Sequence, residues 1–339
     1  MERKEQTVNL RKKLWNRNTI FVYSLLLWPI IHFCVFWIGM NFNTLLHAFM
    51  HSNPLTGESV WISQYEFAEH GIFSNFVDAF ELIFGGKDNN PGQIMNSGAV
   101  WRTLSLIPLS ICINLPITLL CSYGIYKKVF GYKIFRVVLF IPAIVSSVVL
   151  CLVFMLVVDV DYGVLPNFIK SLGGSIKDGG WLYSIKGDNP VFNSAWISIL
   201  MFSVWTGISG NLIYFVSAMS KLPQSCFESA SLDGATEWTQ FIKIVVPMIL
   251  PTVTTILITM IANVFTWFTP TLLLIGPSAG NGSYYSTSTI ALGIVIDTKG
   301  STVYNGVTCA YSFIVAIFGA IIIFTAKSLL EKGNEEVEY

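Results

Sequence analysis

Charged side chains are scarce in this sequence. Asp, Glu, Lys and Arg make up only 12% of its 339 residues, about half the fraction usual in soluble domains. Their formal sum is zero, so the chain lacks the basic surface that would attract nucleic acid. Hydrophobic residues instead make up 53% of the chain, and the mean hydropathy is +0.62. This composition excludes an ordinary soluble protein and predicts an integral membrane protein whose surroundings are lipid.

Paired cysteines and metal-ligand clusters are also missing. The six cysteines lie mostly inside apolar runs without paired spacing, which predicts small buried hydrophobic side chains rather than disulfides. The four histidines lack a cysteine or carboxylate partner at ligand spacing, so no metal site is expected. The sequence also has neither a Gly-rich phosphate loop ending in Lys-Ser/Thr nor a pair of placed carboxylates. We therefore expect no catalytic residue, metal or cofactor on this chain.

Six apolar runs reach the length of about 20 residues that crosses a bilayer core. The predicted membrane helices are 20–40, 99–125, 134–158, 194–219, 245–275 and 304–327. The first follows a Lys/Arg-rich stretch and lacks a small-residue cleavage site, so it is interpreted as a retained helix. The fold class is thus an all-α integral membrane protein with six transmembrane helices. Its expected parts are a tail 1–19, a helix 20–40, an external segment 41–98, a core 99–328 and a tail 329–339.

Basic residues indicate the orientation, because cytoplasmic loops of membrane proteins are enriched in Lys and Arg. If the N-terminus is inside, 14 of the 20 Lys and Arg residues fall on inner segments. The other six fall outside: Lys87, Arg102, Lys170, Lys177, Lys186 and Lys299. Both termini are therefore predicted to be cytoplasmic, in the plasma membrane. The long outer segments 41–98, 159–193 and 276–303 form either small structured caps or solvated loops.

The inner segment 221–251, between the fourth and fifth spans, carries the most specific pattern. Pro223 begins one predicted short helix, and a second follows the Asp233-Gly234 turn. Glu228-x-Ala230-x-x-Asp233-Gly234-Ala235, followed by Phe241, Ile244, Pro247 and Pro251, resembles the coupling loop of binding-protein-dependent ABC importer permeases. The resemblance is nearest to the carbohydrate, maltose-type branch and covers about residues 100–330. An ordinary amphipathic loop between helices is the alternative.

The resemblance implies a fold, partners and a site. It implies the type I ABC importer permease fold, with ATPase coupling by Glu228, Ser229, Ala230, Asp233, Gly234 and Ala235. Ser229 departs from the alanine usual in the family, and its small size should preserve docking. The implied partners are a second permease subunit, two ATPase subunits that carry ATP and Mg, and an extracellular solute-binding protein. Nucleotide-driven movement of the ATPases would push the coupling helices and open the pathway outward.

Polar and aromatic residues interrupt the two spans that flank this loop. The expected pathway residues are Trp205, Thr206, Gly207, Gly210, Asn211, Tyr214, Thr259, Asn263, Thr266 and Trp267. Sugars require such groups, because amides and hydroxyls bond their hydroxyls and aromatic rings stack on their apolar faces. The family resemblance places sugar contacts at Thr206, Gly207, Gly210, Thr259, Asn263 and Thr266, although Gly210 replaces a bulky contact residue. Hydrogen bonding between helices is the alternative role.

Near absence of charge inside the spans favours a neutral solute and weighs against ion coupling. A secondary carrier usually has internal repeats and buried carboxylates, and neither is evident. A membrane-bound enzyme would require His, Asp or Glu clustered at one face, and Asp159 with Asp161 does not form such a cluster. The predicted function is import of a sugar or oligosaccharide, driven by ATP hydrolysis on another subunit. An ABC importer of a non-sugar solute remains the nearest alternative, followed by a secondary carrier.

Overall fold

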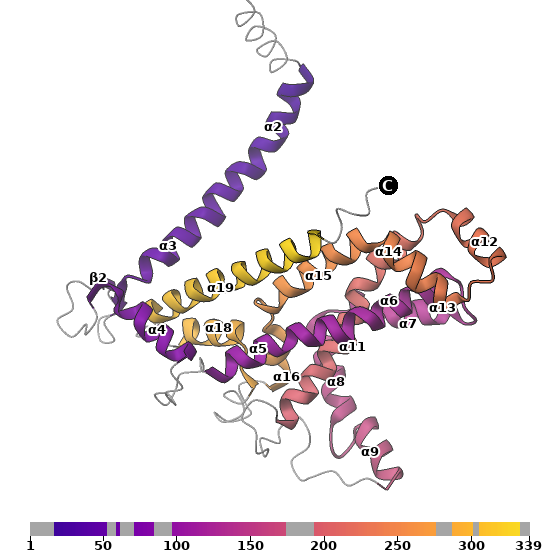
Figure 1. Ribbon diagram of the computed structural model, residues 1–339. Coiled ribbons are helices and arrows are strands. Elements are labelled where there is room, and N and C mark those ends of the chain that lie inside the picture. The colour runs from indigo at the N-terminus through magenta and orange to yellow at the C-terminus, as the bar shows by residue number, and fades with distance from the viewer. Residues whose placement is uncertain are drawn as a thin grey trace, which may run out of the picture. The chain divides into compact units, whose positions relative to one another are not determined.

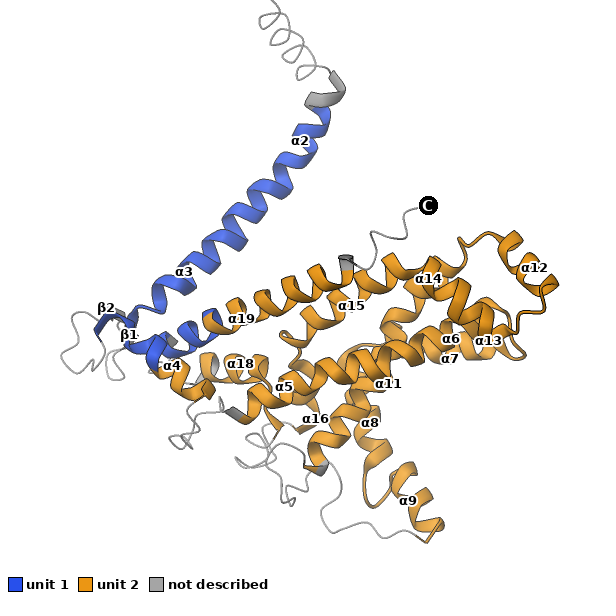
Figure 2. Cartoon of the chain, in the orientation of Figure 1, with its two compact units in different colours: residues 1–77, 302–313 blue, residues 78–301, 314–339 orange. Residues whose placement is uncertain are grey.

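The computed structural model describes residues 17–52, 59–61, 71–84, 97–173, 193–275, 287–300 and 305–332. Its chain forms two compact units, shown in Figure 2. One contains residues 1–77 and 302–313, and the other contains residues 78–301 and 314–339. Most of the expected tails 1–19 and 329–339 lies outside the described residues, as do parts of the three expected outer segments.

The first unit is built on one long apolar helical segment. Three elements follow without a break: α2 (Arg17–His32), the π-helix η1 (Phe33–Ile38) and α3 (Gly39–His47). The segment Phe21–His47 is long and apolar enough to cross a membrane, so the expected span 20–40 extends further at its C-terminal end. Two short strands come next, β1 (Met50–Ser52) and β2 (Ser59–Trp61), paired antiparallel. A 3-10 turn, η3 (Gly71–Phe73), precedes α4 (Ser74–Phe84), which begins in this unit and continues into the second.

The second unit contains the remaining helices, labelled in Figure 1. Its first elements are α5 (Ser97–Leu109), the π-helix η4 (Ser110–Asn114), α6 (Leu115–Tyr126), α7 (Tyr132–Ile144), α8 (Ser147–Val158) and α9 (Val164–Ser171). Then come α11 (Ser194–Met219), α12 (Gln224–Leu232), α13 (Glu237–Gln240), the π-helix η5 (Phe241–Val245), α14 (Val246–Met248) and α15 (Leu250–Val264). The last are α16 (Thr269–Ile275), α18 (Ile290–Gly300) and α19 (Asn305–Lys332), which begins in the first unit.

Four continuous segments of the described chain have the length and hydropathy of a membrane span: Phe21–His47, Gly98–Tyr126, Ala195–Met219 and Gly306–Leu330. Two bent pairs bring the number to the expected six if each pair is one span. Helices α7 and α8 meet at 114°, and the segment from α13 to α14 meets α15 at 73°. The sequence predicted an unbroken helix over 134–158, because apolar residues continue through the bend. The chain instead becomes extended at Val145 (ψ 144°), and Ser146 caps α8.

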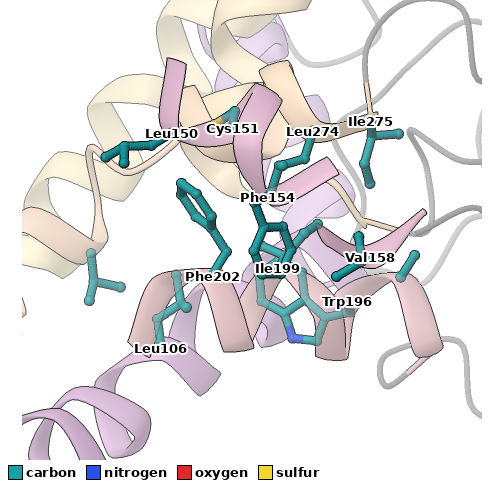
Figure 3. Close-up of a cluster of buried hydrophobic side chains, with 12 residues drawn as sticks. Leu106, Leu150, Cys151, Phe154, Val158, Trp196, Ile199, Phe202, Leu274 and Ile275 are labelled. Atoms are coloured by element: carbon teal, nitrogen blue, oxygen red, sulfur yellow. The ribbon is translucent and has the colours of Figure 1, made fainter. Parts of the chain in front are cut away.

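Two apolar clusters hold the second unit together. One, shown in Figure 3, joins α5, α8, α11 and α16 around the fully buried Trp196. Within it the Phe154 and Phe202 rings meet edge to face, with centroids 5.3 Å apart. The second cluster includes Phe215 and Met219 of α11, which pack with residues of α6, α12, η5 and α15. Burial of such large side chains against several helices fixes the helix packing around both clusters.

One sequence expectation about side chains needs correction, and one charged side chain is buried. The cysteines are not uniformly buried: Cys151 is buried, whereas Cys34 and Cys112 are exposed on apolar helices. All six are free thiols. Arg102, counted among the basic residues of the outer side, is only 1% exposed within α5. Its guanidinium donates hydrogen bonds to the carbonyl oxygen and the hydroxyl of Ser288, at 2.8 and 3.1 Å. These partners offset the cost of burying the charge.

Candidate functional site

The first core span consists of α5, η4 and α6. A cavity of about 180 Å³ lies between this span, α11 and α15. Its lining residues are Leu106, Ser110, Asn114, Ser203, Thr206, Gly207, Asn211, Met260, Asn263, Val264 and Trp267. Three side-chain amides and three hydroxyls are among them, together with one indole ring, and none of these described residues carries a charge. Such a lining offers hydrogen-bond donors and acceptors to an uncharged polar molecule.

Asn114 is one of the polar lining residues that the sequence interpretation missed, as are Ser110 and Ser203. It ends the π-helix η4 and is 3% exposed. Its side-chain oxygen has no hydrogen-bond partner among the described residues. Buried polar atoms are nearly always bonded, and π-helical turns occur frequently at functional sites. Asn114 therefore has a buried, unbonded acceptor oxygen on a side chain that lines the first cavity. The only sequence signal was an amide within an apolar run.

Gly207 allows Asn114 to occupy this place. A β-carbon built on Gly207 would lie 2.7 Å from Nδ2 and 3.2 Å from Cγ of Asn114. These separations are shorter than an ordinary contact between heavy atoms. The absence of a side chain at Gly207 thus lets α11 approach η4 and leaves room for the amide.

A second cavity of about 480 Å³ adjoins the first and shares Thr206, Asn263 and Trp267 with it. It also reaches Pro142, Ala143 and Val145, at the bend between α7 and α8. At the break between α15 and α16 it reaches Phe268 and Thr269, the first residue of α16. Breaks in membrane helices are tolerated where the backbone lines a cavity. Discontinuous helices also build the solute sites of many transporters. Both helix breaks therefore contribute to the lining of this cavity.

The structure brings six of the ten expected pathway residues to these cavities: Thr206, Gly207, Asn211, Asn263, Thr266 and Trp267. The side chain of Asn263 is exposed and makes no hydrogen bond to another described residue, which favours a pathway role over bonding between helices. Trp205, Gly210, Tyr214 and Thr259 line neither cavity and lie on exposed helix faces. Thr259 donates its hydroxyl to the carbonyl oxygen of Thr255, one turn earlier in the same helix.

The expected coupling loop forms the two short helices α12 and α13, and Figure 1 shows them together at one end of the second unit. Gly234 has φ +76°, the left-handed conformation that permits the turn between them. Glu228, Ser229, Asp233 and Gly234 are exposed, whereas Ala230 and Ala235 are half-buried. The Ala235 amide donates to the carbonyl oxygen of Ala230 at 2.9 Å, which closes the end of α12.

One face of α12 is packed against other helices, and the opposite face is exposed. Phe227 is 5% exposed and belongs to the second apolar cluster. Leu232 is 89% exposed, an unusual position for a large apolar side chain next to charged neighbours. Glu237, on α13, accepts hydrogen bonds from Lys127 and Tyr123, which hold the pKa of its carboxyl below the ordinary value. The loop is thus attached to the helices through Phe227 and Glu237 and has an exposed tip at Leu232.

Residues 114–332 match the family of binding-protein-dependent transport system inner membrane components. This match covers well over half of the chain, so the chain belongs to that family. It is an integral membrane permease subunit. Its fold resembles that of a bacterial ABC transporter involved in the import of the acidic polysaccharide alginate, with a TM-score of 0.70 at 20% sequence identity, over 96% of this chain and 99% of that one. A second structure, of a bacterial alginate ABC transporter in complex with alginate pentasaccharide-bound periplasmic protein, gives a TM-score of 0.69 at 20% identity, over 93% and 94%.

Relatives of known function transport different solutes. The sn-glycerol-3-phosphate transport system permease protein UgpA of Yersinia enterocolitica is 24% identical over 69% of this chain and 73% of its own length. The arabinooligosaccharides transport system permease protein AraP of Bacillus subtilis is 25% identical over 58% of this chain and 63% of its own. These similarities confirm the expected family and fold.

Proposed function

We propose that this chain is one permease subunit of an ABC importer for a neutral sugar or oligosaccharide. The observation that carries the proposal is the uncharged lining of the first cavity, which combines three amides, three hydroxyls and an indole. Sugar hydroxyls pair with amides and hydroxyls, and the apolar face of a sugar ring stacks on an aromatic ring. Relatives that import carbohydrates support the solute class.

The charge of the solute distinguishes the two candidate classes, neutral sugars and anionic solutes. Glycerol 3-phosphate and alginate, the solutes in the names of two matches, are anions. A site for a phosphate or carboxylate would be expected to contain a cation, commonly a bidentate arginine. Arg102, the buried cation of α5, does not line either cavity and is bound to Ser288. The cavities therefore favour the neutral oligosaccharide.

The complete importer would contain a second permease subunit, two ATPase subunits that bind ATP and Mg, and an extracellular solute-binding protein. Support for the second permease comes from the exposed Tyr214 on a predicted span, whose hydroxyl would be costly against lipid. The exposed tip of α12 around Glu228 and Leu232 would dock on an ATPase. This arrangement places segment 221–251 and both termini in the cytoplasm, and segment 41–98 outside.

Uptake by the reconstituted importer tests the proposal. Proteoliposomes would contain this permease with its second permease and ATPase, supplied with the binding protein and internal ATP. The labelled solutes would be an arabinotriose, maltotriose, glycerol 3-phosphate and an alginate trisaccharide. We expect ATP-dependent accumulation of a neutral trisaccharide, and none when the ATPase is omitted. Accumulation of an anionic solute alone would refute the neutral-sugar assignment, and accumulation without the ATPase would refute the ABC mechanism.

A further inference from the structure

A buried glutamine, Gln240, connects the coupling loop to the end of the first core span. Gln240 closes α13 and is 2% exposed. Its side-chain oxygen accepts a hydrogen bond from Lys127 at 3.1 Å. Its side-chain nitrogen donates to the Ser231 hydroxyl and to the Ala235 carbonyl oxygen, both at 3.1 Å. One amide therefore joins α12, the turn after it, α13 and the C-terminal end of α6.

Lys127 and Glu237 complete this arrangement. Lys127 lies 2.9 Å from the Glu237 carboxylate, and the Tyr123 hydroxyl donates to the same carboxylate oxygen at 2.7 Å. The Lys127 ammonium also lies 5.1 Å from the centre of the Phe227 ring, within the range of a cation–π contact. We call Tyr123, Lys127, Ser231, Glu237 and Gln240 the Gln240 cluster.

The Gln240 cluster holds its helices together more firmly than an exposed ion pair alone would. The Glu237 side chain is 69% exposed, and such pairs contribute little to folding. Gln240, in contrast, is buried with all three of its hydrogen bonds between different segments. Buried polar networks that are fully bonded hold their members in one geometry. Movement of α12 therefore carries the inner end of α6 with it.

We propose, on the basis of the proposed function, that the Gln240 cluster transmits movement of the coupling helix α12 to the first core span. Helix α6 continues through η4 into α5, and this span brings Ser110 and Asn114 to the first cavity. Displacement of α12 would then reach the first cavity through α6. It would also reach it through α11 and α13, which precede and follow α12 in the chain. Gln240 is a positioning residue in this account, because it contacts neither solute nor ATPase.

The test measures ATP hydrolysed per solute transported, using the whole importer in proteoliposomes with maltotriose or arabinotriose. Gln240→Leu, Lys127→Glu and Glu237→Lys should each raise this ratio about five-fold or more, the lower end of couplings between protein sites. The KM for the solute and the yield of assembled complex should stay near wild type. Combining Lys127→Glu with Glu237→Lys restores the ion pair but not the hydrogen bond to the Gln240 side-chain oxygen, because a carboxylate cannot donate it, so the ratio of the double variant should stay raised.

Lys243→Glu is the matched control, since it makes the same charge change as Lys127→Glu on an exposed η5 residue whose side chain forms no hydrogen bond or ion pair with a described residue. Its ratio should equal that of wild type. An unchanged ratio in Gln240→Leu, Lys127→Glu and Glu237→Lys would overturn the proposal. A lower complex yield with an unchanged ratio in the assembled fraction would overturn it too, because the cluster would then be structural only.

A distance measurement separates this proposal from the solute assignment. Spin labels at Ser225→Cys on α12 and Leu120→Cys on α6, two exposed positions, in a variant without native cysteines, report the distance between these helices with and without ATP. We expect one unchanged distance in the otherwise native complex and a changed or broadened one in Gln240→Leu. A wild-type distance that changes with ATP would refute the link even if sugar uptake is normal. Failure of sugar uptake with a fixed distance would refute the solute assignment alone.

Discussion

Replacing Gly207 with alanine should weaken solute uptake, because the new methyl group would collide with Asn114. The methyl carbon would lie 2.7 Å from Nδ2 of Asn114, where carbon and nitrogen normally keep about 3.5 Å apart. Asn114 is 3% exposed and lines the first cavity, so the cavity is the space into which its amide can turn. The amide must turn or α11 must shift away from η4. Either change displaces the side-chain oxygen from its present position at the first cavity.

The expected cost to the fold is small compared with the effect on uptake. Overpacking costs about 1–3 kcal/mol, while alanine gains about 1 kcal/mol over glycine within a helix. Assembly of the importer should therefore survive. A lost solute hydrogen bond is worth about 0.5–1.5 kcal/mol, and about 1.4 kcal/mol corresponds to a ten-fold change. The KM for uptake should rise about 2- to 12-fold by the same conversion.

Gly210→Ala provides the control, three residues further along α11. A β-carbon there would meet nothing within 4 Å, and the gain in helix propensity is the same. Initial rates of ATP-driven uptake in proteoliposomes, with maltotriose or arabinotriose, would be compared for both variants. Equal KM values for Gly207→Ala and Gly210→Ala would refute the role given to Asn114.

Three further predictions concern single sites. Asn263→Leu should abolish or alter uptake while the complex still assembles, and normal uptake with dissociation in detergent would make Asn263 a contact between helices. Gly234→Pro and Glu228→Lys should each reduce stimulation of ATPase activity and co-purification of the ATPase while membrane insertion stays normal, and unchanged stimulation in both would exclude the docking role. Arg102→Met should lower the stability of the complex by about 1–3 kcal/mol, because Ser288 loses buried partners. Thermal unfolding in detergent measures this, and a melting temperature equal to wild type would contradict it.

The spans and the coupling loop were predictable because they rest on local patterns. Apolar runs of sufficient length identify spans without knowledge of their neighbours, and Gly234 is where the chain needs a positive φ. The bend at Val145 was not predictable, since both α7 and α8 are apolar and the break depends on what the bent chain packs against.

The candidate site was predictable only in part, because some of its residues matter through contacts that form only in the folded chain. Thr206 and Asn263 were recognisable as polar groups in spans next to the coupling loop. Asn114 lies in another span, and its importance comes from the close approach of Gly207, a tertiary contact between residues far apart in sequence. Gln240 was missed likewise, because its partners Lys127 and Ser231 come together only in the folded chain.

Protection of a thiol in the first cavity tests the account most directly. Ser203, which lines that cavity, would be changed to cysteine in a variant whose six native cysteines are replaced by alanine. Ile213→Cys on the same helix, 55% exposed and outside both cavities, is the control. During ATP-driven transport of a neutral trisaccharide, the account predicts that saturating solute slows modification of Cys at 203 by a small thiol reagent but not at 213. Equal modification rates with and without solute at 203, while uptake proceeds normally, would contradict a pathway through this cavity.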